Sequence, residues 1–175
     1  MVGGTSHAGK STLASELASA LTGGHLSTDS LGRHPGRPWG RPLENIPAHV
    51  KDYYLNLSTK EQLDDVLRHY GSLWPKIDEH VKARISNLSL PPLIVEGSAI
   101  LPETAGTYRQ EGLHTLWLTA APDTLRLRIE KESKFGSAAS TEQRLIEAFI
   151  RRTLAFDRHI REEVSSAMQA QLLET

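Results

Sequence analysis

A short segment near the first residue of the sequence, bounded by glycines, most constrains the fold. Residues 4–11 read G-T-S-H-A-G-K-S, which matches the G-x-x-x-x-G-K-[ST] pattern of a phosphate-binding P-loop. Glycines at both ends allow backbone angles that let successive N–H groups point at one anion. The lysine can reach the β- and γ-phosphates, and the serine hydroxyl can bind Mg²⁺. We therefore predict a nucleotide-binding segment made of Gly4, Thr5, Ser6, His7, Ala8, Gly9, Lys10, Ser11 and Thr12.

The residues on either side of the P-loop indicate a strand and a helix. Leu13, Leu17 and Leu21 recur every four residues, which predicts a helix over residues 11–21. The positive end of such a helix would point at the bound phosphates. A P-loop follows a buried strand, and only three residues precede this one. Either that strand is very short, or the recorded start lies downstream of the true one.

Strand-like and helix-like segments alternate along the rest of the chain. Residues 25–28, 93–97 and 114–119 read as strands, whereas residues 121–134 and a long segment from residue 141 read as helices. A capping box at residues 58–61 opens another helix, which we expect Gly71 and Pro75 to interrupt or kink. The pattern predicts an α/β fold with a parallel sheet of four strands, the first stunted and no fifth after the final helix.

Length and composition narrow the class of protein. The 175 residues fit a single domain, 1–175, and no run of about 18 apolar residues predicts a membrane span. We see no secretion signal before the P-loop, and the absence of cysteine excludes disulfides and thiolate chemistry. These features fit a cytoplasmic enzyme. The net charge of -1 does not indicate a nucleic-acid partner.

Two carboxylates stand at the ends of predicted strands. Asp29 follows the second strand and Glu96 ends the third. Ligands of an open parallel sheet bind beyond the carboxyl ends of its strands, so both acids should face the P-loop edge. Each can hold Mg²⁺, contact the substrate or accept a proton from an attacking hydroxyl. Alternatively, Asp29 is a turn residue ahead of Ser30, and Glu96 is a buried acid with a structural partner.

Residues 3–12, 26–29 and 93–97 together carry a resemblance. The chain resembles the P-loop small-molecule kinases, nearest to uridine kinase, nicotinamide riboside kinase and phosphoribulokinase, and its G-G-T-S opening is similar to 2-phosphoglycerate kinase. The resemblance implies a P-loop NTPase three-layer sandwich with a kinase-like strand order, here with edge strands stunted or missing. It also implies ATP and Mg²⁺ as cofactors, with Ser11, Asp29 and Glu96 around the metal and Asp29 as the base.

The resemblance further implies an arginine-bearing lid after the fourth strand, for which residues 131–152 are the candidate. The basic residues near it are Arg126, Arg128, Lys131, Lys134, Arg144, Arg151, Arg152 and Arg158. A lid cation stabilises charge on the transferring phosphoryl group. We favour Arg128 and Arg152 for that role. A solvated helix face is the alternative reading of each.

The loop over residues 30–47, which we call the acceptor-side loop, is the clearest candidate in the sequence for binding the acceptor of the phosphoryl group. It is rich in proline and glycine and carries Arg33, His34, Arg37, Trp39 and Arg41. Arginine can bind a carboxylate or phosphate through two parallel hydrogen bonds, so we expect an anionic acceptor, or a planar one stacked on the indole of Trp39. A surface loop with incidental arginines, or an RNA contact, is the alternative.

These features predict a Mg²⁺- and ATP-dependent kinase that phosphorylates a hydroxyl of a small, anionic metabolite. Three other functions remain open. They are a toxin-like kinase of a macromolecule or sugar nucleotide, a non-catalytic ATP-binding module, and a GTPase-type switch. Residues 29–32 fit the D-x-x-G pattern of a GTPase, but the chain contains no N-K-x-D guanine motif.

Overall fold

The fold is built on one parallel sheet. A computed structural model describes residues 1–32, 34–87, 89–106, 108, 112–166 and 171–175. Within these residues, five parallel strands are ordered β2-β3-β1-β4-β5. The strands are β1 (Val2–Gly4), β2 (Gly24–Ser27), β3 (Leu93–Glu96), β4 (Leu116–Thr119) and β5 (Gln171–Glu174).

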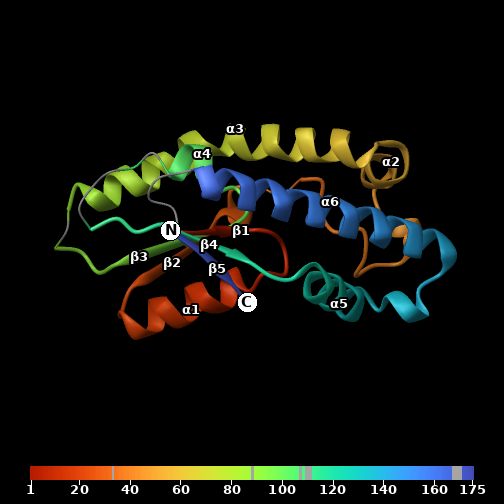
Figure 1. Cartoon of the computed structure of the whole chain (residues 1–175), viewed down its shortest axis with the longest axis horizontal. Helices are drawn as coiled ribbons and strands as arrows, with labels where there is room; N and C mark the ends of the chain where they lie inside the picture. The colour runs from red at the N-terminus through yellow and green to blue at the C-terminus, as the bar shows by residue number, and fades with distance from the viewer. Residues whose placement is uncertain (33, 88, 107, 109–111, 167–170) are drawn as a thin grey trace.

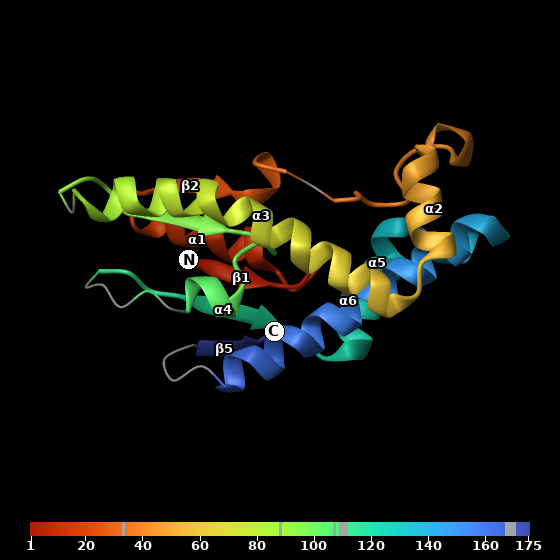
Figure 2. The same cartoon turned by 90° about the horizontal axis from the view of Figure 1, so that it is seen from above.

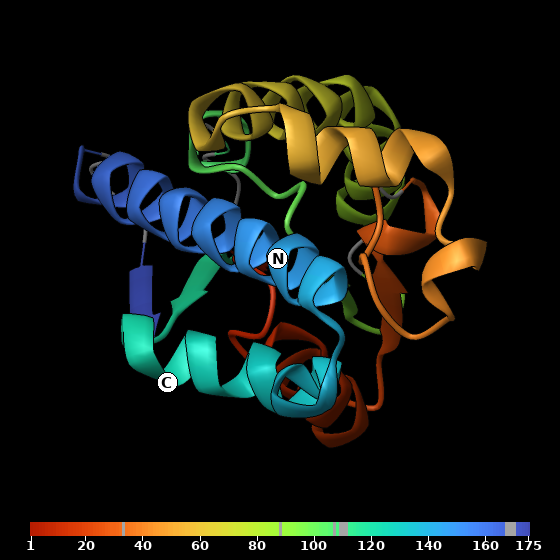
Figure 3. The same cartoon turned by 90° about the vertical axis from the view of Figure 1, so that its right-hand side faces the viewer.

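Helices cover both faces of this sheet. They are α1 (Lys10–Ala20), α2 (Ala48–Asn56), α3 (Thr59–Ile85), α4 (Pro102–Ala105), α5 (Pro122–Ser133) and α6 (Ser140–Ser166). The long helices α3 and α6 lie side by side on one face, and α1 lies on the other (Figures 1 and 2). Seen from its end, the molecule has α5 on the same side as α1 (Figure 3). In the part of the chain that the structure describes, no helix has the length and apolar character needed to cross a membrane.

The first strand is as short as the sequence predicts, but it lies at the centre of the sheet. Val2 pairs with Glu96 of β3 on one side and with Leu116 of β4 on the other. The prediction of a stunted first strand is therefore confirmed, and the structure adds that this strand is a central one. The strand can be short because both neighbouring strands satisfy its backbone groups and bury it fully.

The prediction that no strand follows the last helix is wrong. The strand β5 pairs in parallel with β4, and the N–H of Thr175 donates to the carbonyl of Thr119 at 2.9 Å. Its four residues, Q-L-L-E, are too few to show a strand pattern in sequence, and an edge strand has only one neighbour to satisfy.

The helix α3 starts where the sequence predicts, but the interruption that we allowed for at Gly71 and Pro75 does not occur. Ser58 and Glu61 form the expected capping box, with the Glu61 N–H donating to the Ser58 hydroxyl at 3.3 Å. The helix then continues through Gly71 and Pro75 to Ile85. A proline costs a helix about 3 kcal/mol. Burial of the apolar face of α3 against α6 and the sheet offsets that cost.

A second core cluster lies beyond the carboxyl edge of the sheet. It joins α2 to the end of α5 and the first half of α6, through Val50, Tyr53, Ile129, Leu145 and Phe149. The candidate lid, residues 131–152, consists here of the end of α5, a short link and the first half of α6. This packing places the candidate lid against the end of the acceptor-side loop.

We predict that Gly3→Ala destabilises the protein by about 2 kcal/mol or more. A Cβ at Gly3 would lie 2.4 Å from the Trp117 ring and 2.6 Å from the Ile100 carbonyl oxygen. The control is Gly71→Ala on the exposed side of α3, where a Cβ meets no atom within 4 Å. Higher helix propensity should make that variant more stable by about 1 kcal/mol. Urea unfolding measures both, and equal stability of the two variants would contradict the packing argument.

Candidate functional site

The predicted P-loop links β1 to α1 in a conformation that glycine makes possible. Backbone φ is +124° at Gly4, +66° at His7 and +90° at Gly9. A Cβ on Gly4 would stand 2.1 Å from the Leu118 carbonyl oxygen, so no side chain fits there. Gly9 then precedes the first residue of α1 in the left-handed conformation. The loop is thus wrapped around the amino end of a helix, the arrangement that binds phosphate.

Lys10 lies inside this loop. Its side chain is buried, with the whole residue 8% exposed, and its ammonium donates to the Thr5 carbonyl at 2.6 Å. Burial lowers the pKa of Lys10 to about 8, against the opposing attraction of Glu96 and Asp29. A phosphate group bound in the loop would pair with this ammonium and favour its charged form.

Glu96 meets the P-loop side of the sheet as predicted. It is 3% exposed, and its Oε1 accepts a hydrogen bond from the Ser11 hydroxyl at 3.3 Å. The His25 Nε2 lies 3.7 Å from the same oxygen. Among the described residues, no group of three or more His, Cys, Asp or Glu could hold a metal ion. A hydroxyl and a carboxylate still fit Mg²⁺, which keeps several waters and substrate phosphates as ligands.

Asp29 follows β2 and lies at the same edge of the sheet as Glu96 and the P-loop. It stands in a short 3₁₀ turn, Thr28–Ser30, on the exposed side of the chain. Gly97 makes the approach of this turn to β3 possible, because a Cβ there would stand 1.7 Å from Thr28 Oγ1. The charge of Asp29 acts on Lys10 and on Tyr70. Two predicted acids from separate strands therefore face one P-loop.

A cavity of about 360 Å³ opens beside the P-loop. It is lined by Ser6 of the P-loop and by most of the predicted acceptor residues, together with Asp29 and an arginine of α6. The predicted residues at its wall are Asp29, His34, Arg37, Trp39, Arg41 and Arg152. Arg33, also predicted to contact the acceptor, lies outside the described residues. The acceptor-side loop thus forms one wall of a real cavity.

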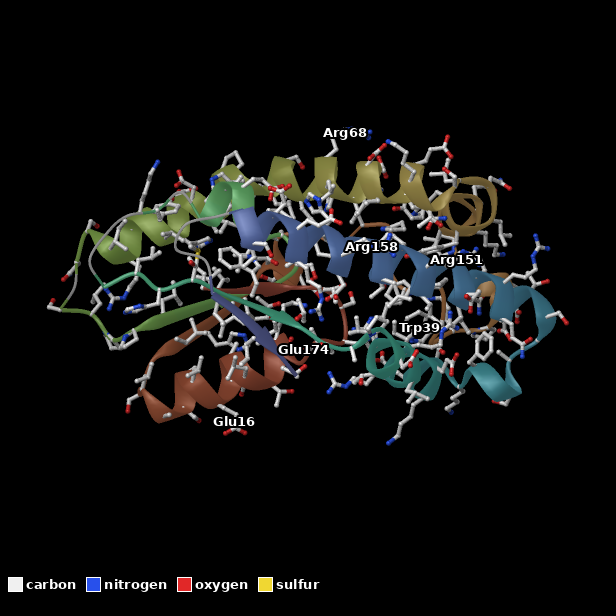
Figure 4. All side chains as sticks on the ribbon, in the orientation of Figure 1. Glu16, Trp39, Arg68, Arg151, Arg158 and Glu174 are labelled. Atoms are coloured by element: carbon white, nitrogen blue, oxygen red, sulfur yellow. The ribbon has the colours of Figure 1, made fainter. Side chains whose placement is uncertain are left out.

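The side chains of this loop have partners from distant parts of the chain. His34 contacts Asp65 of α3, and Trp39 packs edge-on against Phe149 of α6 with ring centroids 4.6 Å apart. Figure 4 shows Trp39 between the ribbons of α5 and α6. The indole is therefore already in contact with an aromatic ring of the protein.

Glu132 is a site residue that the sequence did not indicate. One of its carboxylate oxygens pairs with Arg37 of the acceptor-side loop, and the other lies 2.8 Å from His7 Nε2 of the P-loop. Burial lowers the pKa of His7, opposed by the attraction of Glu132. Glu132 is an exposed glutamate on α5, and only the fold brings it near residues 95 and 125 positions away.

The predicted lid arginines occupy different surroundings. Arg128 donates to the His7 carbonyl of the P-loop at 2.9 Å, from the exposed side of α5. Arg126, two residues earlier, turns away and forms two bonds of 2.9 Å to Glu147. Arg152 is not on an exposed lid surface but is buried on α6, at the wall of the acceptor cavity. Of the two residues that we favoured, only Arg128 contacts the P-loop from the α5 side.

A larger, open cavity of about 900 Å³ lies on the other side of the P-loop. Its wall includes His7, Gly9 and Thr12 from the P-loop region, Arg128 from α5, and Leu173 of β5. Next to β5, the Thr175 hydroxyl donates to the Ala8 carbonyl at 3.1 Å. Because β5 was not predicted, this cavity was not predicted either.

No model of a known protein family matches the chain, and no curated protein matches it.

We predict that Glu132→Gln loosens the acceptor-side loop. The neutral amide loses the ion pair with Arg37. An exposed ion pair contributes up to about 1 kcal/mol, so chymotrypsin should cleave after Trp39, which is followed by Gly40, roughly two- to fivefold faster. Glu44→Gln, an exposed glutamate of the same loop, is the control and should leave the rate unchanged. Equal cleavage rates in wild type and Glu132→Gln would show that Glu132 does not hold the loop.

Proposed function

We propose that the protein is a phosphotransferase that uses ATP and Mg²⁺ to phosphorylate a hydroxyl of a small, anionic metabolite. The observation that carries this proposal is the position of the P-loop between two cavities. The larger cavity, on the side of Gly9 and Thr12, is suited to a nucleoside, and the smaller one opens at Ser6 and Asp29. Phosphates bound in the loop would be accessible to an acceptor from the smaller cavity.

The strand order supports the same class of protein. In the order β2-β3-β1-β4-β5, the P-loop strand is central, with the strand that ends in Glu96 beside it. We propose that this is the kinase-like order implied by the resemblance, within a P-loop NTPase three-layer sandwich. The order also brings the ends of β2 and β3 together, so that Asp29 and Glu96 stand on one side of the loop.

Each residue then has a role that its position allows. Lys10 and the loop N–H groups bind the phosphates, and Arg128, which reaches the loop from α5, adds positive charge. Ser11 and Glu96 would hold Mg²⁺, which neutralises phosphate charge when bound. Asp29, at the wall of the acceptor cavity, accepts the proton of the attacking hydroxyl.

The test is ATP consumption in the presence of Mg²⁺, with and without a protein-free extract of small metabolites. Consumption that requires the extract and disappears in Lys10→Met would support the proposal. Consumption that is equal with and without extract indicates an ATPase or a switch. ATP binding without consumption indicates a macromolecular acceptor or a non-catalytic module, and a preference for GTP indicates a GTPase.

We predict that Asp29→Asn lowers kcat by about 100-fold or more, because the amide cannot accept the proton. ATP affinity should change little, since Lys10 and the loop N–H groups remain. Asp64→Asn, an exposed aspartate on α3 paired only with Lys60 in the described contacts, is the control. The measurement is kcat with the fractionated acceptor, beside ATP affinity by calorimetry. A variant with full kcat would remove Asp29 from the reaction.

A further inference from the structure

Arg152 is a buried cation in unusual surroundings. It is 6% exposed on α6, and its guanidinium carbon lies 4.7 Å from the centre of the Phe149 ring and 5.7 Å from that of Tyr54. Within the described residues, no acidic side chain forms an ion pair with it, and its buried Nη1 has no hydrogen-bond partner. The surrounding rings favour a cation but do not supply an opposite charge.

Such an arrangement is costly for stability alone. An arginine side chain stays charged inside proteins, and buried charges are normally paired. Arg152 instead has aromatic neighbours on α2 and α6 and an unsatisfied N–H group. A residue kept in this state is better explained by binding a ligand than by stabilising the fold.

The position of Arg152 identifies where that ligand would bind. The residue lines the acceptor cavity and also a narrow recess between Ser6 of the P-loop, Tyr70 of α3 and Ser98 after β3. Burial raises the pKa of Tyr70, so its hydroxyl stays neutral and can donate. The guanidinium therefore stands at the inner end of the acceptor cavity, next to the P-loop and two hydroxyl groups.

The described arginines of the acceptor-side loop, Arg37 and Arg41, are both exposed and therefore less suited to this role. Arg37 has a side chain 51% exposed and already pairs with Glu132, which also contacts His7. An anion at Arg37 would have to compete with that carboxylate, whereas one at Arg152 would not. The buried site also excludes water, which strengthens an ionic hydrogen bond.

We propose that Arg152 binds an oxyanion, a carboxylate or phosphate, of the acceptor at the inner end of the acceptor cavity. This inference rests on the proposed function and restricts its substrate class. The cavity of about 360 Å³ corresponds to roughly a dozen water-sized groups. The acceptor is thus a small hydroxylated acid or phosphate ester, and Arg152 is a substrate-binding residue rather than a lid cation.

The first experiment uses inorganic phosphate as the probe. The protein is saturated with Mg²⁺ and a non-hydrolysable ATP analogue, which blocks the P-loop, and phosphate is titrated by calorimetry. We expect Arg152→Met to weaken phosphate binding at least tenfold. Arg151→Met is the matched control, because the adjacent arginine on α6, labelled in Figure 4, is exposed, and its Nη1 lies 3.9 Å from Glu147 Oε1. A parallel titration with acetate separates a carboxylate site from a phosphate site. Undetectable binding of both anions to the wild-type protein would overturn the proposal.

Stability without ligand separates a binding role from a structural one. If Arg152 serves a ligand, Arg152→Met should unfold at the same or a higher temperature than wild type. With the P-loop blocked by Mg²⁺ and the ATP analogue, phosphate should raise the unfolding temperature of the wild-type protein and not that of the variant. Arg152→Lys keeps a cation in place, so it preserves folding if the Met variant does not, and should bind phosphate about tenfold more weakly. Unchanged phosphate binding in the folded variants would overturn the proposal.

The charge of the acceptor tests the Arg152 proposal separately from the proposed kinase function. The metabolite extract is passed over an anion-exchange resin, and each fraction is tested for ATP consumption. Activity in the retained fraction supports the anion site. Activity only in the unretained fraction would overturn the anion site and leave the kinase intact. If the ATP analogue does not bind, the proposed function fails, and phosphate titration of the Lys10→Met protein still tests Arg152 separately from the P-loop.

Discussion

The close approach of β1 to β4 is the constraint on which the site depends. At Gly3 and Gly4, a Cβ would collide with Trp117 and with the Leu118 carbonyl. Only a strand without side chains at these points can enter the centre of the sheet and leave it in the tight P-loop. The amino end of α1, the burial of Lys10 and the contact of Ser11 with Glu96 all follow from that path.

Two buried cations flank the same small region. Lys10 and Arg152 are 8% and 6% exposed, and Glu96 is the buried carboxylate close to the first of them. Burying charge opposes folding, and each protein has a limited margin of stability. The large α3–α6 and sheet core offsets this cost. The site is therefore a region where binding of anions is favoured at the expense of stability.

The parts predicted from sequence are those encoded locally. The P-loop, the helix after it, the strand ending in Glu96 and the cap at Ser58 each rest on neighbouring residues. The missed parts depend on distant residues. The strand β5 forms by pairing with β4, and α3 stays helical through Pro75 because burial of its apolar face stabilises it. Glu132 contacts His7 only in the folded protein. Spacing along the chain contains no signal for such contacts.

Arginine patterns show this limit most clearly. The acceptor-side loop gathers cations in sequence, which indicates an anion clamp, yet Arg37 is neutralised by a carboxylate from α5. Arg152 has no distinguishing sequence context, and it is a buried arginine at the cavity with no carboxylate partner among the described contacts. The electrostatic potential of a cavity depends on which charges remain unpaired after folding. Because Glu132 contacts both His7 and Arg37, it links the P-loop to the acceptor-side loop. The proposed nucleotide and acceptor sides are thus connected through one glutamate as well as through the sheet.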